Sequence, residues 1–298
     1  EVDDAREVRN YVLAMEHGLQ RVQDGFPVSI RLLRELHGVL LSGVRGQHRR
    51  PGELRASPVW IGGSTLEDAV FVPPPTEVMH VALGDLERFL HEQDMPLLVQ
   101  LALAHYQFEV IHPFLDGNGR IGRLLIPLML VLRDALTQPL LYLSAYFEQH
   151  RSEYYDQLLM TSQRGDLVPW LRFFLRGVRR QARDAEERTV RLVELQHELR
   201  SELLDEGRAN SVVRLAENLF SVPIVTAARA EELLGVTRPT AHAAIDALVE
   251  RGDLVEVTGR ERGRIYEAPR IFEAVYGGVH VEEGEPDRQL SLEVDADG

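Results

Sequence analysis

The stretch of sequence that decides the fold spans residues 112–123 and reads HPFLDGNGRIGR. Its three glycines allow the backbone to approach a ligand closely and to adopt positive φ. The stretch runs directly into a predicted helix, whose unpaired N–H groups and dipole favour an anion. Arg120 and Arg123 add guanidinium groups suited to phosphate oxygens. The sequence therefore predicts an anion site at this helix start.

Two further side chains add chemistry to the predicted anion site. Asp116 is a carboxylate at its mouth, where a hard metal ion that bridges phosphates can bind. His112 titrates near neutral pH, so it can take a proton from an attacking hydroxyl. A base, a carboxylate and a cationic anion site together indicate group transfer from a nucleoside triphosphate.

Composition excludes several other chemistries. The chain has 298 residues, which predicts two domains. It contains no Cys, so thiol nucleophiles, Cys-ligated zinc and disulfides are excluded. It also contains no Lys, and all 33 basic residues are Arg, which excludes a Walker A loop and a Schiff-base lysine. The net charge of -14 disfavours a surface that binds nucleic acid or anionic lipid throughout.

The sequence carries no run of about 18 apolar residues and no signal-peptide pattern. We therefore expect no membrane association and a cytoplasmic location. Because the chain begins at Glu1 without Met, we also expect that further residues precede it.

Hydrophobic periodicity predicts a mostly helical first domain over residues 1–206. Helices are expected at 5–23, 29–41, 76–93, 96–111, from about 120 onwards, and at 152–163. Residues 58–61 and 70–72 are expected to form the two short strands of a hairpin at 57–72. A long helix at 168–204 is expected to connect this domain to the next.

The last third of the chain changes in character. Residues 207–278 predict a helix-turn-helix, with Thr226 as a helix cap, followed by a two-stranded β-wing. Residues 279–298 are expected to form a disordered acidic tail, since 281–298 carry seven acids against one Arg.

The 112–123 segment resembles the Fic family motif HxFx(D/E)GNGRxxR at every specified position. The stretch PGELRASPVWIGG at 51–63, with AVFVPPP at 69–75, resembles the family's flap region. Residues 140–158 resemble the segment that follows the family core, so the resemblance covers roughly residues 5–200. The C-terminal part resembles the winged helix of many bacterial Fic proteins. The expected fold is mainly α: a Fic helical core with a β-hairpin flap, then a winged helix-turn-helix domain.

The resemblance implies a protein adenylyltransferase (an AMPylator), which transfers AMP from ATP to a Tyr, Thr or Ser hydroxyl of a target protein and releases pyrophosphate. His112 would be the catalytic base, Asp116 would hold Mg²⁺, and Phe114 would anchor the loop in the core. The nucleotide would be bound by Gly117, Asn118, Gly119, Arg120, Ile121, Gly122, Arg123 and Tyr154. The target would pair its backbone with the 57–72 hairpin. A Lys in place of Gly119 is typical of relatives that resemble phosphotransferases, so Gly119 favours nucleotide transfer.

Two alternative functions stay open: removal of AMP from modified proteins at the same site, and DNA-bound regulation with a nucleotide-sensing core. Residues 207–272 carry nine Arg and nine acids, a balance that does not favour DNA binding. A homodimer is left open.

Many family members also carry an inhibitory helix with the pattern [ST]xxxE[GN]. The nearest match, SAYFEQ at 144–149, is incomplete and lies in the wrong region. We therefore expect that helix upstream of Glu1, so that this chain is less inhibited than a longer form and Arg123 is free to bind phosphate.

Overall fold

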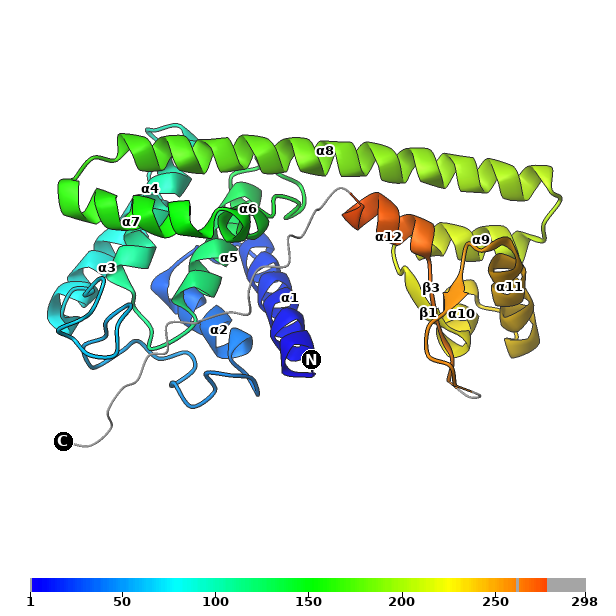
Figure 1. Cartoon of the computed structure of the whole chain (residues 1–298), viewed down its shortest axis with the longest axis horizontal. Coiled ribbons are helices and arrows are strands. Elements are labelled where there is room, and N and C mark those ends of the chain that lie inside the picture. The colour runs from blue at the N-terminus through cyan, green and yellow to red at the C-terminus, as the bar shows by residue number, and fades with distance from the viewer. Residues whose placement is uncertain (1, 261–262, 278–298) are drawn as a thin grey trace. The chain divides into compact units, whose positions relative to one another are not determined.

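A computed structural model of the chain describes residues 2–260 and 263–277. The described part is mainly helical and divides into two compact units, between Ala182 and Arg183 (Figure 1). The predicted acidic tail at 279–298 lies outside the described residues. Within the described part, no helix combines the length and the apolar character that crossing a membrane requires.

The N-terminal unit consists of helices joined by loops. They are α1 (Val2–Gln23), α2 (Ile30–Leu40), α3 (Thr76–Leu90), α4 (Leu97–Ile111), α5 (Asn118–Leu132), α6 (Leu143–Gln149), α7 (Arg151–Arg164) and the first part of α8 (Val168–Asp205). The predicted helices are found within a few residues of their expected bounds. Ser29 caps α2 as expected, because its side chain accepts a hydrogen bond from the Leu32 N–H.

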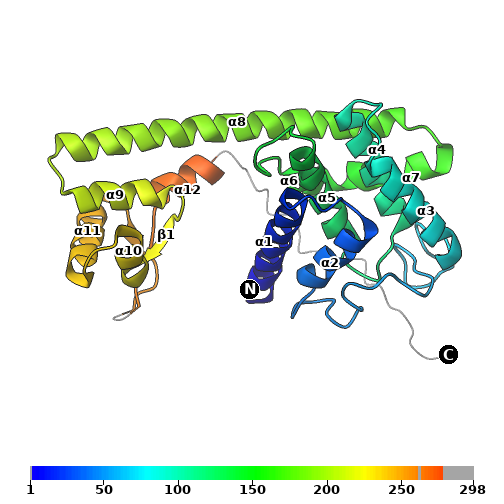
Figure 2. The same ribbon diagram turned by 180° about the vertical axis from the view of Figure 1, so that it is seen from behind.

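Helix α5 lies in the middle of this unit. It packs against α1 and α4, as the rear view in Figure 2 shows, and α4 also packs against α3. Most of α5 is buried, which explains why its sequence after Arg123 is almost entirely apolar. From α8, the aromatic side chains of Trp170, Phe173 and Phe174 complete the core. The start of α5, where the 112–123 motif ends, is therefore fixed by packing on several sides.

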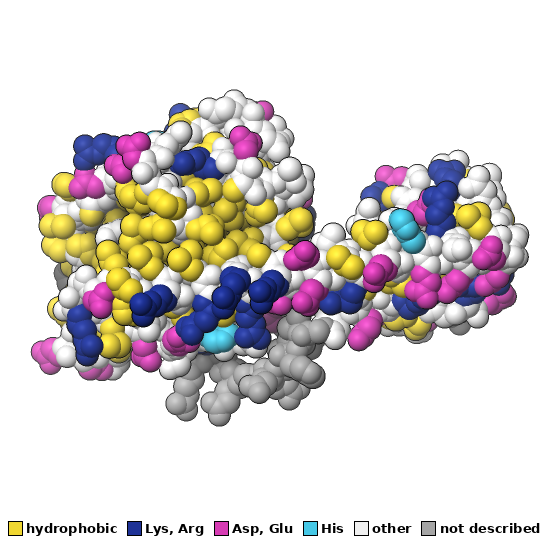
Figure 3. All heavy atoms as spheres, turned by 90° about the horizontal axis from the view of Figure 1, so that it is seen from above, with side chains coloured by type: hydrophobic (Ala, Val, Ile, Leu, Met, Phe, Trp, Pro, Cys, Tyr) yellow, Lys and Arg dark blue, Asp and Glu magenta, His cyan; other side chains and the backbone are white. Residues whose placement is uncertain are grey.

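Some apolar side chains of the N-terminal unit remain at the surface. Figure 3 shows them gathered on one face, with arginine side chains beside them. Exposed examples in this unit are Leu98, Leu140, Tyr142 and Val168. Extended apolar surface of this kind is typical of places where another molecule binds.

The predicted hairpin at 57–72 is reduced to one isolated antiparallel bridge, between Ile61 and Phe71. The expectation of two short strands is therefore wrong. The turn between them is held instead by Asp68, whose carboxylate accepts hydrogen bonds from the N–H groups of Ser64 and Thr65. These local bonds favour a compact loop over a longer ladder.

The C-terminal unit contains the second part of α8 and a small sheet among short helices. In chain order they are α9 (Asn210–Leu219), β1 (Ile224–Thr226), α10 (Ala227–Leu234), α11 (Arg238–Arg251), β2 (Val255–Glu256), β3 (Ile265–Glu267) and α12 (Pro269–Tyr276). The strands pair antiparallel in the order β1-β3-β2, with Tyr266 opposite both Val225 and Glu256. Thr226 caps α10 by accepting a bond from the Arg229 N–H, as expected.

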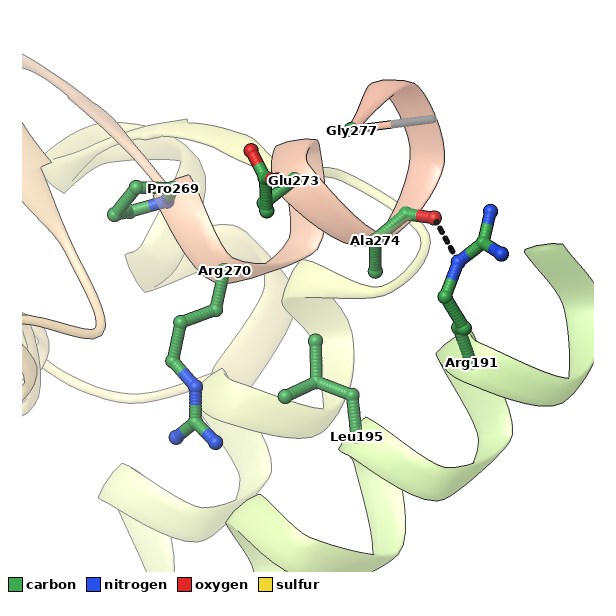
Figure 4. Close-up of a pocket in the computed structure, with 7 residues that line it drawn as sticks. All are labelled: Arg191, Leu195, Pro269, Arg270, Glu273, Ala274 and Gly277. Atoms are coloured by element: carbon green, nitrogen blue, oxygen red, sulfur yellow. Dashed lines mark hydrogen bonds between the residues drawn. The ribbon is translucent and has the colours of Figure 1, made fainter. Parts of the chain in front are cut away.

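A shallow hollow lies between the second part of α8 and α12 in this unit (Figure 4). Arg191 closes one end by donating a hydrogen bond to the Ala274 carbonyl. Arg270, which lines the hollow, is paired with Glu198, Glu202 and Asp253. Its charge is therefore already compensated, and the hollow offers no free cation from this residue to an anionic ligand.

Candidate active site

The motif loop begins where α4 ends. His112 closes that helix in the left-handed conformation, with φ 49° and ψ 61°, and its N–H donates to the Phe108 carbonyl. A residue other than glycine rarely adopts this conformation, which persists only where the surrounding structure enforces it. At the other end, Gly117 has φ 78° and starts α5. The loop therefore turns sharply at both ends and brings His112 and the first turn of α5 into one short segment.

The imidazole of His112 is oriented by the helix before it. Its Nδ1 lies 3.3 Å from the Glu109 carbonyl oxygen. A carbonyl can only accept, so Nδ1 carries the proton and Nε2 keeps a lone pair. Burial lowers the pKa of His112 to about 4. The ring is therefore neutral at pH 7, with Nε2 able to accept a proton.

Phe114 anchors the loop in the core, as the sequence predicts. Its ring stacks on His37 with 3.9 Å between the ring centroids. The Asn118 amide brackets the Phe114 backbone: Oδ1 accepts from the Phe114 N–H, and Nδ2 donates to the Phe114 carbonyl, both at 2.9 Å. Because both ends of the Asn118 amide are held by the Phe114 backbone, the backbone N–H of Asn118 is the better placed group for its predicted contact with phosphate.

The first turn of α5 gathers the predicted anion-binding groups. The N–H groups that begin a helix have no partner within it. The N–H of Gly117 donates to Asp116 Oδ1 at 2.6 Å, and that carboxylate also lies 3.5 Å from Arg120. Arg120 is further paired with Glu7 of α1 at 3.2 Å. Gly119 and Gly122 lie along this turn, and Ile121 is buried beneath it.

Arg123 is the less compensated of the two motif arginines. Within residues 2–260 and 263–277, it has no hydrogen bond and no ion pair. Its guanidinium lies over Gly119, so a Cβ added at Gly119 would come within 3.0 Å of Arg123 Nη1. Arg120 already has Asp116 and Glu7 as partners, whereas a cation such as Arg123 at the positive end of a helix opposes the dipole unless an anion joins it. The local charge therefore favours binding of an anion.

Asp116 is the predicted metal ligand. The described residues hold no group of three or more His, Asp or Glu side chains that could ligate a metal. Mg²⁺, however, is often held by one or two carboxylates together with substrate phosphates. A single carboxylate beside a helix start that is predicted to bind an anion fits that minimal arrangement.

Tyr154, predicted to contact the nucleotide, lies in the hydrophobic core. It is 4% exposed, and its hydroxyl lies 3.0 Å from His105 Nε2. His105 Nδ1 donates to the Gly122 carbonyl, so His105 Nε2 accepts the proton of Tyr154. Burial raises the pKa of Tyr154 well above its ordinary value. Tyr154 therefore supports α5 from behind, through His105, and its contact with nucleotide stays a prediction.

Sequence reasoning missed Glu109, which lies one helical turn before His112. Its side chain is 11% exposed, and its Oε1 is the one buried side-chain polar atom among the described residues without a hydrogen-bond partner. Burial raises the pKa of Glu109 to about 7, against the opposing effect of Arg123. It is the only Asp, Glu or Arg in the sequence of α4, and that isolation was the available signal.

The motif loop lies in a segment that resembles known proteins. Residues 27–130 match the Fic/DOC family. This Fic segment includes the whole motif loop and most of α5. Over 175 residues, or 58% of the chain, the sequence is 32% identical to the protein adenylyltransferase Fic of Drosophila ananassae. It is 31% identical, over the same length, to the protein of that name from Drosophila melanogaster. The chain spans about a third of the length of these curated relatives.

A solved structure extends the likeness beyond the Fic segment. The crystal structure of a Fic family protein from Desulfovibrio desulfuricans G20 matches 90% of this chain and 76% of its own, with a TM-score of 0.54 and 23% identity. At this identity the match shows a shared fold and nothing about the reaction.

Proposed function

We propose that the chain transfers AMP from ATP to a hydroxyl group of a target protein. The observation that carries this proposal is the placement of a histidine, with its proton on Nδ1 and its lone pair on Nε2, beside the helix start that holds Arg120 and Arg123. The relatives named protein adenylyltransferase Fic support the same reaction class.

In the proposed step, the target hydroxyl gives its proton to His112 Nε2 as its oxygen attacks the α-phosphorus. The bond from that phosphorus to the oxygen bridging to the β-phosphate breaks, and pyrophosphate leaves. A general base works best with a pKa near the working pH. A bound polyphosphate beside the ring favours its charged form, so the pKa of His112 should rise from about 4 when nucleotide binds.

The first turn of α5 would hold the phosphates. The backbone N–H groups of Asn118 to Arg120 point toward the helix start, and Arg120 and Arg123 add charge-assisted hydrogen bonds. The contact between Arg120 and Glu7 must loosen or be shared when phosphate arrives. Asp116 would hold Mg²⁺, which supplies charge neutralisation between phosphate oxygens.

The loop at 57–72 is the proposed docking edge for the target. Ile61 and Phe71 already exchange backbone hydrogen bonds across it. An extended target segment could lengthen this single bridge by pairing with the outer edge of the loop.

For the C-terminal unit we propose a winged helix. The order of elements supports this assignment: α10 and α11 form two successive helices, and β2 and β3 then form a hairpin paired with β1.

The decisive experiment uses Mg²⁺ and ATP labelled at the α-phosphate, with the chain alone and with a cell lysate. We expect labelled protein from the wild type, at least a hundredfold less from His112→Ala, and none from ATP labelled at the γ-phosphate. ATP binding should survive in His112→Ala, because the base does not bind phosphate. Equal labelling by wild type and His112→Ala would contradict the proposal.

A further inference from the structure

Arg55 lies buried between the motif loop and the docking loop. The residue is 1% exposed. Among the described residues, its guanidinium donates only to backbone carbonyls. Nε donates to His112 at 2.9 Å, Nη1 to Ser57 at 3.3 Å, and Nη2 to Pro74 and to Ile111. The Arg55 N–H also donates to the Pro113 carbonyl at 2.9 Å.

These acceptors belong to two functional segments. Ser57 begins the proposed docking loop at 57–72 and Pro74 follows its end, while His112 and Pro113 begin the motif loop. One rigid fork therefore joins both ends of the docking loop to the backbone of the proposed base. Among the described residues, no carboxylate is bonded to Arg55. A buried cation without a counter-charge adds little to stability. The role of Arg55 therefore follows from which backbone carbonyls it joins.

His37 holds the other end of the motif loop. Its Nδ1 accepts a hydrogen bond from the Gly52 N–H at 2.8 Å, so Nε2 must carry the proton that it donates to the Asp116 carbonyl at 2.9 Å. The segment 52–55 thus restrains the motif loop at His112 through Arg55 and at Asp116 through His37.

We propose that Arg55 is a positioning residue for His112 and that, through it, the docking loop and the motif loop move as one unit. His112 keeps its left-handed backbone because Arg55 fixes its carbonyl. A target that orders the docking loop would then also order the base. The part of this inference that concerns catalysis rests on the proposed AMP transfer, whereas the mechanical coupling does not.

The test compares Arg55→Met and Arg55→Lys in the full chain, with Arg50→Met as the matched control. Arg50 lies in the same loop, is exposed, and pairs only with Glu53 among the described residues. Amide hydrogen exchange should become at least tenfold faster in both 57–72 and 112–117 in Arg55→Met, and should stay unchanged in Arg50→Met. Arg55→Lys should fall between them, because an ammonium group can satisfy only some of the carbonyls.

AMP-transfer kinetics supply a second readout. We expect kcat to fall at least thirtyfold in Arg55→Met while KM for ATP changes less than about threefold, because the phosphate-binding groups of α5 are untouched. Arg55→Lys should recover part of kcat. If Arg55→Met does not fold, Arg55→Lys decides alone.

Faster exchange in only one of the two loops, or a kcat within twofold of wild type in either folded variant, would overturn the inference. Absence of AMP transfer in the wild type would count against the proposed function instead. The exchange experiment would still decide whether the two loops are coupled.

Discussion

At the scale of single residues, the site is notable for ionisable groups held away from water. Burial lowers the pKa of His37, of His105 to about 3 and of His112 to about 4, so all three rings are neutral at pH 7. Burial acts on Glu109 in the opposite direction and raises its pKa to about 7. Protonation of the three buried imidazole rings costs folding free energy, so they destabilise the folded state as pH falls below about 6.5. Ionisation of the buried Glu109 carboxyl destabilises the folded state as pH rises.

Glu109→Gln should therefore stabilise the protein at high pH. The folded state binds a proton at Glu109 more tightly than the unfolded state, so the stability this residue contributes is present at low pH and is lost as pH rises from about 4.5 through 7. Removing the charge should raise the free energy of unfolding by up to about 3 kcal/mol at pH 8.5 and by little at pH 4. Urea denaturation at both pH values measures this.

Arg123, His105 and Tyr154 face Glu109. Arg123 lowers the pKa of Glu109, so the raised pKa comes from burial. Glu148→Gln, at an exposed position of α6, is the control and should show no pH-dependent gain. A gain for Glu109→Gln of equal size at pH 4 and pH 8.5 would refute the assignment.

Residue types and their spacing were enough to predict an anion site in the 112–123 segment and positive φ among its glycines, and the resemblance to the Fic family implied the burial of Phe114. Residue types and spacing were not enough to predict where the side chains of Asn118 and Tyr154 point. A polar side chain next to a site can also bond the surrounding protein, as Asn118 bonds Phe114 and Tyr154 bonds His105. Arg55 and His37 were missed for a related reason. Their partners are backbone carbonyls 57 and 79 positions away. Because every residue carries a backbone carbonyl, the residue types do not reveal such a partner.

At the scale of elements, helices were predictable where a cap or a strong apolar face marked them, as Ser29 marks α2. Short elements were not. Helix α6 has only seven residues, and β1 has three whose partners lie about forty positions later in β3. Strands that are far apart in the sequence pair only when the whole unit folds. The local sequence pattern therefore carries little information about this pairing.

Two helical glycines should respond oppositely to the same substitution. A Cβ at Gly177 of α8 would come within 2.5 Å of the buried Tyr146 ring, whereas a Cβ at Gly84 of α3 would meet nothing within 4 Å. Gly177→Ala should destabilise the protein by about 1–3 kcal/mol through overpacking. Gly84→Ala should stabilise it by up to about 1 kcal/mol through helix propensity. Thermal denaturation of both variants measures the contrast, and a shift of the same sign in both would contradict it.

At the scale of the whole molecule, the part of the chain that the structure describes has two separate hydrophobic cores. Helix α8 serves both: Trp170 and Phe173 belong to the first core, and Leu199 and Leu203 to the second. Separate cores are the usual basis for separate unfolding transitions.

We expect calorimetry to resolve two transitions that single core substitutions shift one at a time. Leu36→Ala empties part of the first core, and Leu248→Ala part of the second; both side chains are fully buried. Each should cost about 2–5 kcal/mol in its own unit. A single transition that moves equally in both variants would show that the units unfold together.

The left-handed backbone of His112 has an evolutionary consequence. Asparagine tolerates this conformation better than most residues, and its amide can donate to the Glu109 carbonyl as Nδ1 of His112 does. A codon for histidine becomes one for asparagine by one base change. A folded descendant of this protein that has lost its proposed base but keeps its proposed phosphate site is therefore a single mutation away, and selection on folding alone would not remove it.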